Sequence, residues 1–220
     1  MRPRLLAWLA SVGVAAALAG CVSLKRTPEA RFFVLRPIAE APPATDTPAA
    51  AGLVGLLPVV LPGYIDRPQL VSWVAPGELR IDEYVRWAEP LDAGVARTLA
   101  ANLQVLLPES RVIRSPWPSA ARVRCRVRVE LQRFGPQTSG EVRLEGRFAL
   151  LPPDGERPLV ARPVAFTRGP HAVSPAGLDP MASVEAMSDL LEDLAREVAA
   201  AVGALPSAAD APSPGPPAPR

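Results

Sequence analysis

The chain has 220 residues, with 28 prolines, 24 basic and 22 acidic side chains. Once Arg2 and Arg4 leave with the leader described below, 22 basic residues balance 22 acidic ones, which argues against a nucleic-acid-binding protein. The remaining length, about 200 residues, is enough for one domain with a substantial core.

An uncharged apolar run over residues 5–20 follows the basic start Met-Arg-Pro-Arg. As a helix it would reach about 24 Å, whereas the hydrocarbon core of a bilayer is about 30 Å thick. The basic start, the short apolar centre and the small residues Ala19 and Gly20 together predict a secretory signal peptide over residues 1–20.

The end of this leader, Leu18-Ala19-Gly20-Cys21, resembles the bacterial lipoprotein lipobox at all four positions. The resemblance implies that Cys21 is lipidated after cleavage and that residues 21–30 form a tether. Two or three acyl chains would hold the protein stably on a membrane. Enterobacterial lipoproteins that are retained in the inner membrane carry Asp at the position after the cysteine. Val22 at that position instead resembles lipoproteins sorted to the outer membrane, where the domain would face the periplasm. An ordinary secreted protein and a weak signal anchor are the alternatives, and inner-membrane retention is less favoured.

Residues 31–205 are predicted to form a single domain with a loop at 39–52. Residues 31–37 and 53–62 predict strands, the second interrupted at Pro58. Residues 69–90 predict a hairpin turning at Ala75-Pro76-Gly77. Residues 92–108 predict a helix with Asp92 at the N-cap and one apolar face, formed by Val95, Leu99, Leu103 and Leu106. Residues 111–115 predict a strand that completes a β–α–β crossover.

Residues 122–132 alternate without error between apolar and charged side chains, which predicts a half-buried strand. Its partner is predicted at 141–150. A register that places Val129 opposite Leu144 would also set Arg128 opposite Glu145 and Glu130 opposite Arg143. The alternation puts four arginines on one side: Arg122, Arg124, Arg126 and Arg128.

Residues 159–168 predict a further strand, placed at a sheet edge by Pro163. Residues 179–205 predict a helix with Asp179 as its cap and Pro180 at its first position. Its apolar face consists of Met181, Val184, Met187, Leu191, Leu194, Val198 and Val202. The tail at 206–220 is rich in proline and predicted to be disordered. These elements predict an α+β two-layer domain, a mixed, mostly antiparallel twisted sheet with two helices packed on one face.

The sequence predicts no catalytic site, no metal site and no cofactor. The one histidine, His171, lies in a Pro/Gly loop and is interpreted as a solvated side chain. Cys125 falls among the inward valines of its strand and is interpreted as a buried apolar residue rather than a reactive thiol. A paired-carboxylate site remains open to test on a structure.

Two segments, residues 64–73 and 86–92, mix aromatic, arginine, proline and acidic residues in a way that suits a contact surface. We expect them to lie together at one end of the sheet, with Asp66 and Arg67 paired or capping a turn. Aromatic residues that close the edge of the core are an equally favoured explanation. The candidate interface residues are Tyr64, Asp66, Arg67, Pro68, Gln69, Arg86, Trp87, Glu89 and Pro90.

A family resemblance includes these segments and extends beyond them. Residues 61–71, residues 86–91 and the helix with Ala100, Asn102 and Leu103 resemble the PqiC-type auxiliary lipoproteins of MCE-type ABC transport systems. The match runs from about residue 53 to Trp117. The resemblance implies a non-enzymatic, membrane-tethered periplasmic component of a lipid transporter. It would dock with an MCE-domain partner anchored in the opposite membrane, as part of an oligomer. A structural or assembly lipoprotein unrelated to lipid transport is the first alternative, and a tethered hydrolase is the second.

The arginine side of strand 122–132 and an acidic side of helix 179–205 suggest a contact between copies of the chain. Residues 185–197 carry five acidic side chains, including Glu192 and Asp193, opposite the helix's apolar face. Two surfaces of opposite sign suit head-to-tail contact between copies, which can close into a ring. The arginines could also bind phospholipid headgroups. A solvated outer face is the favoured alternative.

Overall fold

The computed structural model describes residues 28–38, 52–169, 173–174 and 177–206. Its larger sheet has five strands in the order β5 (Arg111–Arg114), β2 (Leu53–Leu56), β6 (Val123–Pro136), β7 (Val142–Leu151) and β8 (Val160–Arg168). β2 runs parallel to both of its neighbours, whereas β6, β7 and β8 pair antiparallel. The sheet is therefore mixed, and most of its paired residues are antiparallel because the β6–β7 and β7–β8 pairings are the longer ones.

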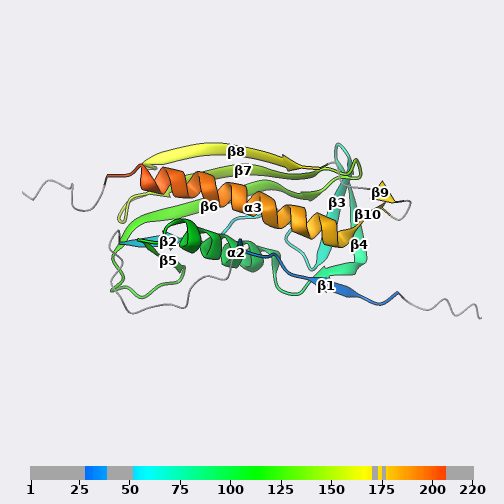
Figure 1. Ribbon diagram of the computed structural model, residues 1–220, viewed down its shortest axis with the longest axis horizontal. Helices are drawn as coiled ribbons and strands as arrows, with labels where there is room; N and C mark the ends of the chain where they lie inside the picture. Colours follow the sequence, from blue (N-terminus) through cyan, green and yellow to red (C-terminus); the bar gives the residue numbers. More distant parts are fainter. Residues whose placement is uncertain (1–27, 39–51, 170–172, 175–176, 207–220) are drawn as a thin grey trace, which may run out of the picture.

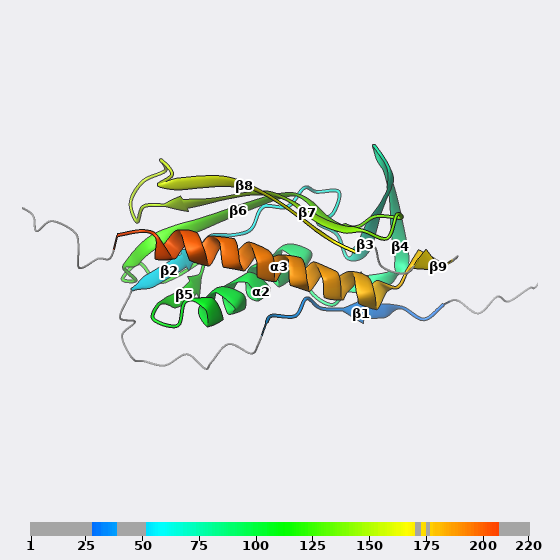
Figure 2. The same cartoon turned by 45° about the horizontal axis from the view of Figure 1, so that its top comes forward.

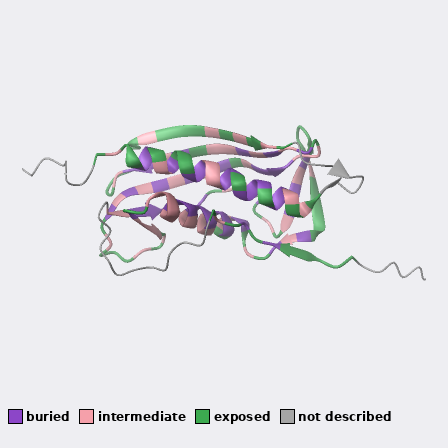
Figure 3. Cartoon of the chain, in the orientation of Figure 1, coloured by how far each residue is buried: buried purple, intermediate pink, exposed green. Residues whose placement is uncertain are grey.

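Helices α2 (Leu91–Leu106) and α3 (Pro180–Gly203) lie side by side on one face of this sheet (Figures 1 and 2). α3 packs on β6, β7 and β8, and α2 packs on β5. Buried residues alternate with intermediate or exposed ones along both helices (Figure 3). This arrangement confirms the predicted two-layer α+β fold. Within the described residues, no helix is long and apolar enough to cross a bilayer.

A smaller sheet stands at one end of the molecule, where β1 (Arg31–Phe33) pairs in parallel with β4 (Glu78–Trp87), and β4 pairs antiparallel with β3 (Gln69–Ala75) (Figure 1). The β3–β4 hairpin is confirmed, and Gly77 supplies its turn with a φ of 81° that other residues rarely adopt. Two short strands, β9 (Val173–Ser174) and β10 (Gly177–Leu178), form a separate antiparallel pair.

Proline interrupts the strand predicted at 53–62, as expected. β2 ends at Leu56, and the chain resumes pairing beyond Pro58 at Val60, which bridges to Glu130 on β6. The strand predicted at 31–37 is shorter than expected, because β1 ends at Phe33.

The predicted register between the two long strands is wrong by four residues. Val129 lies opposite Phe148, not Leu144, and Glu130 lies opposite Arg147, not Arg143. The physical reason is the length of β6, which continues through a bulge to Pro136 and so moves the turn toward Gly140. The expected Arg128–Glu145 pair is therefore also wrong: Glu145 contacts Arg133.

The two helix starts differ in how well they were predicted. Asp179 caps α3 by accepting a hydrogen bond from the Met181 amide at 3.1 Å, as expected. α2 starts one residue early, with Pro90 at the cap position, so Asp92 lies in the first turn. Met181 is 47% exposed although its position was predicted to be buried.

Residues 1–20, Cys21, most of the loop at 39–52, His171 and nearly all of the tail lie outside the described residues.

Candidate functional site

The two candidate interface segments lie together, as expected. The Trp87 amide donates a hydrogen bond to the Pro68 carbonyl at 2.7 Å, and Gln69 pairs with Arg86 in the β3–β4 ladder. Between them is a cavity of about 330 Å³ lined by Asp66, Arg67, Pro68, Trp87, Ala88, Glu89, Pro90 and Leu91. We call this surface the 66–90 site.

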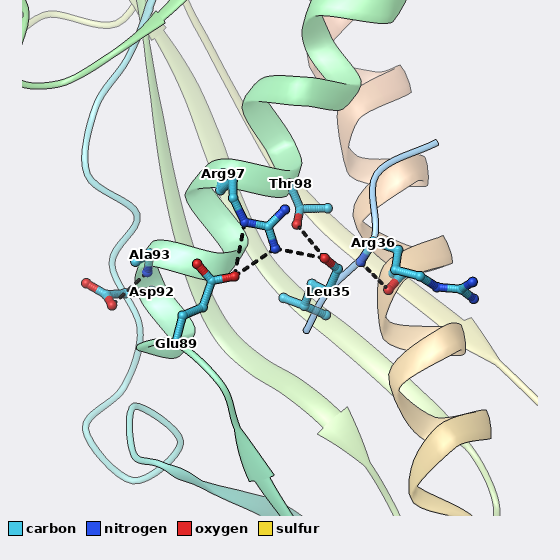
Figure 4. Close-up of polar contacts among 8 residues, drawn as sticks. Leu35, Arg36, Glu89, Asp92, Ala93, Arg97 and Thr98 are labelled. Atoms are coloured by element: carbon cyan, nitrogen blue, oxygen red, sulfur yellow. Dashed lines mark hydrogen bonds and ion pairs between the residues drawn. The ribbon is translucent and has the colours of Figure 1, made fainter. Parts of the chain in front are cut away.

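Trp87 and Glu89 connect the 66–90 site to the rest of the domain. Trp87 is buried in the core, so its ring anchors the end of β4. Glu89 accepts hydrogen bonds from Arg97 at 2.7 and 3.0 Å, which joins the entry of α2 to the first turns of that helix (Figure 4). The rigid support of Trp87 and Glu89 fixes the positions of the more exposed residues around them.

The exposed part of the 66–90 site carries one acidic and one basic side chain, Asp66 and Arg67. Asp66 is exposed, and Arg67 is half-buried, with its Nε donating to the Gln69 side chain at 3.4 Å. Among the described residues, no ion pair joins Asp66 to Arg67. Arg86 contacts Glu83 instead of a residue of the other segment. A partner can therefore reach the carboxylate of Asp66 without breaking an ion pair of the described chain.

Tyr64 lies apart from this cavity. Its ring meets Trp73 edge-on, with 6.0 Å between the ring centroids, and its hydroxyl donates to the Gln132 carbonyl. Burial raises the pKa of the Tyr64 hydroxyl. Arg133 lies over the Trp73 ring at 5.5 Å, which gives this aromatic pair a cation–π contact. Tyr64 thus joins the smaller sheet to β6.

Sequence reasoning missed a third feature, the chain segment 33–38, which lies against both helices. Arg97 and Thr98 of α2 donate to the Leu35 carbonyl at 2.8 and 3.4 Å, and the Arg36 amide donates to Ser188 of α3 at 3.1 Å (Figure 4). The Ile38 amide donates to the Asn102 side chain at 2.8 Å. Thr98 and Asn102 on the apolar side of α2 could have predicted this contact from the sequence. Buried polar groups need hydrogen-bond partners, so a further chain segment had to pack against that side of the helix.

The predicted arginine side forms contacts within the chain. Arg124 donates to the Leu205 carbonyl at 2.7 Å, beyond the end of α3, where cations interact favourably with the helix dipole. Arg126 donates to the Pro152 carbonyl at 3.0 Å. Arg128 contacts Glu156 at 2.6 Å and lowers the pKa of that carboxyl. Arg122 precedes β6 and is exposed.

The acidic side of α3 is likewise matched within the chain. Asp193 contacts Arg168, Glu192 contacts Arg196, and two further bridges run from α3 to Arg36 and Arg162. Burial raises the pKa of Asp193, whereas Arg168 acts in the opposite direction. Head-to-tail contact through these charges remains a prediction, and it would compete with bridges that each copy already makes.

No group of three histidine, cysteine or carboxylate side chains able to hold a metal occurs within the described residues. Cys125 is buried in β6, and burial raises the pKa of its thiol, which disfavours the reactive thiolate.

Comparisons with known proteins give one family. The model described as "ABC-type transport auxiliary lipoprotein component" matches residues 33–199. A crystal structure described as an uncharacterized protein is similar, with a TM-score of 0.62 and 20% identity over 80% of this chain and 99% of that chain. A Xanthomonas campestris protein of the DUF330 family model has a TM-score of 0.61 and 17% identity over 77% of this chain and 93% of its own. At these identities the two structures show a shared fold. The comparison with curated proteins found no match.

Proposed function

Because the chain belongs to the family of ABC-type transport auxiliary lipoprotein components, we propose that it is a membrane-anchored, non-enzymatic accessory protein of such a transporter in the periplasm. The observation that carries this proposal is the span of the family match, from β1 through most of α3. The match therefore concerns the whole described fold rather than one motif.

The anchor in this proposal is Cys21, held in the outer membrane by its acyl chains. The family description as a lipoprotein supports lipidation, and Cys21 ends the lipobox-like segment. Replacing Cys21 with serine is expected to abolish labelling by a clickable fatty acid and to release the protein from membranes. Labelling of the Cys21→Ser protein at the wild-type level would rule out this anchor.

The transporter is proposed to be of the MCE type and to move lipids, and the 66–90 site is proposed to dock with its MCE-domain protein. The support is geometric: Asp66 and Arg67 rim a cavity that Trp87 and Glu89 hold in place. Arginine and aromatic side chains around a cavity are typical of interface hot spots. The assembly of several copies into a ring remains part of the proposal.

Charge reversal at the site tests the docking. The double variant Asp66→Arg with Arg67→Glu is expected to lower recovery of the MCE-domain protein at least tenfold when the tagged full chain is purified from membranes. The control reverses two exposed charges on the far part of the hairpin, Glu78→Arg with Arg80→Glu. Equal recovery with both variants and the wild type would contradict the docking role.

A further inference from the structure

A second cavity lies on the face of the larger sheet opposite the helices. It measures about 480 Å³, within the roughly 300–1,000 Å³ typical of ligand pockets. Its walls belong to β2, β5 and the chain that follows β5. They consist of Leu53, Arg111, Ile113, Arg114, Pro116, Trp117, Pro118 and Ala121.

The position of Trp117 depends on a glycine. Val54 and Leu56 of β2 point into the core, so Gly55 between them faces the other side of the sheet. A Cβ atom at Gly55 would lie 2.7, 3.0 and 3.1 Å from three carbons of the Trp117 six-membered ring. The indole therefore rests directly on the strand backbone, and it forms one wall of the cavity.

The ionisable side chains that line the cavity are all basic. Arg111 and Arg114 are the ionisable residues of its lining, and Arg122 follows Ala121 and is exposed. Within the described residues, the guanidinium groups of Arg111 and Arg114 make no ion pair, whereas Arg126 and Arg128 on the same sheet both contact Glu156. Among the described residues, two cations without an ion-pair partner thus border an otherwise apolar wall.

We propose that this cavity binds a phospholipid with an anionic headgroup. Its phosphate would lie on Arg111 and Arg114, since guanidinium binds phosphate with two parallel hydrogen bonds, and the start of an acyl chain would lie on Ile113 and Trp117. The apolar majority of the lining favours a lipid over a free phosphate ion, because an ion alone would leave these walls exposed to water.

The inference rests on the proposed function for the source of the lipid, because a lipid transporter would bring phospholipid to this protein. The binding itself is measured without any transporter component. A failure here would therefore leave the docking role standing, and a failure of docking would leave the lipid-binding result standing.

The experiment is native mass spectrometry of the full chain in a nonionic detergent, which measures the fraction that retains lipid. The probes are dioleoyl phosphatidylglycerol, the phosphatidylcholine with the same acyl chains, and inorganic phosphate. The wild type is expected to retain phosphatidylglycerol at least tenfold better than phosphatidylcholine. A tenfold or greater excess of inorganic phosphate is expected to displace little of it.

Three variants locate the binding. Arg111→Gln with Arg114→Gln removes the charges, and Ala121→Phe fills the cavity while leaving the charges in place. Both are expected to lower retention of phosphatidylglycerol at least tenfold. The control, Arg31→Gln with Arg80→Gln, removes two charges from the smaller sheet and is expected to bind like the wild type.

Four results would overturn the proposal. They are no retained lipid in the wild type, equal retention of both lipids, complete displacement by inorganic phosphate, and wild-type retention by the Arg111→Gln, Arg114→Gln protein. Arg114 is exposed, Arg111 is half-buried, and neither side chain forms an ion pair among the described residues. Thermal unfolding of this variant should therefore match that of the control. The arginine comparison then tests the proposal even if Ala121→Phe does not fold.

Discussion

The charged side chains of β6 and β7 form ion pairs that the alternating sequence pattern could not predict. The pattern correctly separated valines from arginines on β6, and the valines are buried. It could not fix which acid meets which arginine, because that choice depends on where the turn falls. Glu130 thus receives a hydrogen bond from Arg147 at 2.8 Å, and Arg128 reaches the loop beyond β7.

A charge exchange tests this register at the level of one pair. Glu130→Arg should destabilise the protein because it places two arginines side by side, and adding Arg147→Glu should restore about 0.2–1 kcal/mol. Adding Arg143→Glu instead, as the pattern alone would suggest, should restore nothing. Urea unfolding measures all three proteins. Rescue by Arg143→Glu but not by Arg147→Glu would show that the strands pair in the other register.

The segment 33–38 is an element that joins the start of the domain to both helices. Leu35 is 2% exposed, and its carbonyl accepts hydrogen bonds from Arg97 and Thr98. The neighbouring Val34 is 47% exposed. Leu35 therefore belongs to the core, although it precedes every strand of the larger sheet.

Truncation of the two neighbouring side chains tests this assignment. Leu35→Ala should lower the free energy of unfolding by about 2–5 kcal/mol, because it leaves a cavity between packed elements. Val34→Ala should change it by no more than about 0.5 kcal/mol, since its side chain is on the surface. Chemical denaturation of the full chain measures both. Similar losses for the two variants would mean that the segment is not packed as described.

The elements themselves were largely predictable, since period-two and helical patterns report burial directly. Pro58 correctly broke one strand, and Asp179 correctly capped α3. Asp92 is not the cap because Pro90, two residues earlier, already occupies the cap position. The packing of residues 33–38 against α2 and α3 was not predictable, because it arises only when two helices distant in sequence pack together.

At the scale of the whole molecule, the 66–90 site and the proposed lipid cavity lie in different places. The 66–90 site is formed where the hairpin meets the start of α2, whereas the arginine-bordered cavity is on β2 and β5. Family membership and fold identify an accessory lipoprotein of a transporter. The sequence pattern identified the residues of the 66–90 site as interface candidates. The structure shows that Trp87 is buried and that Glu89 is hydrogen-bonded to Arg97.

Site-specific photo-crosslinking in membranes that contain the transporter tests the proposed docking most directly. A photoreactive amino acid would replace Asp66 at the 66–90 site or, as a control, Glu78 at the far end of the hairpin. The docking proposal predicts a crosslink to the MCE-domain protein from position 66 and none from position 78. Absence of that crosslink from position 66 in membrane-bound protein, or equal crosslinking from both positions, would contradict it.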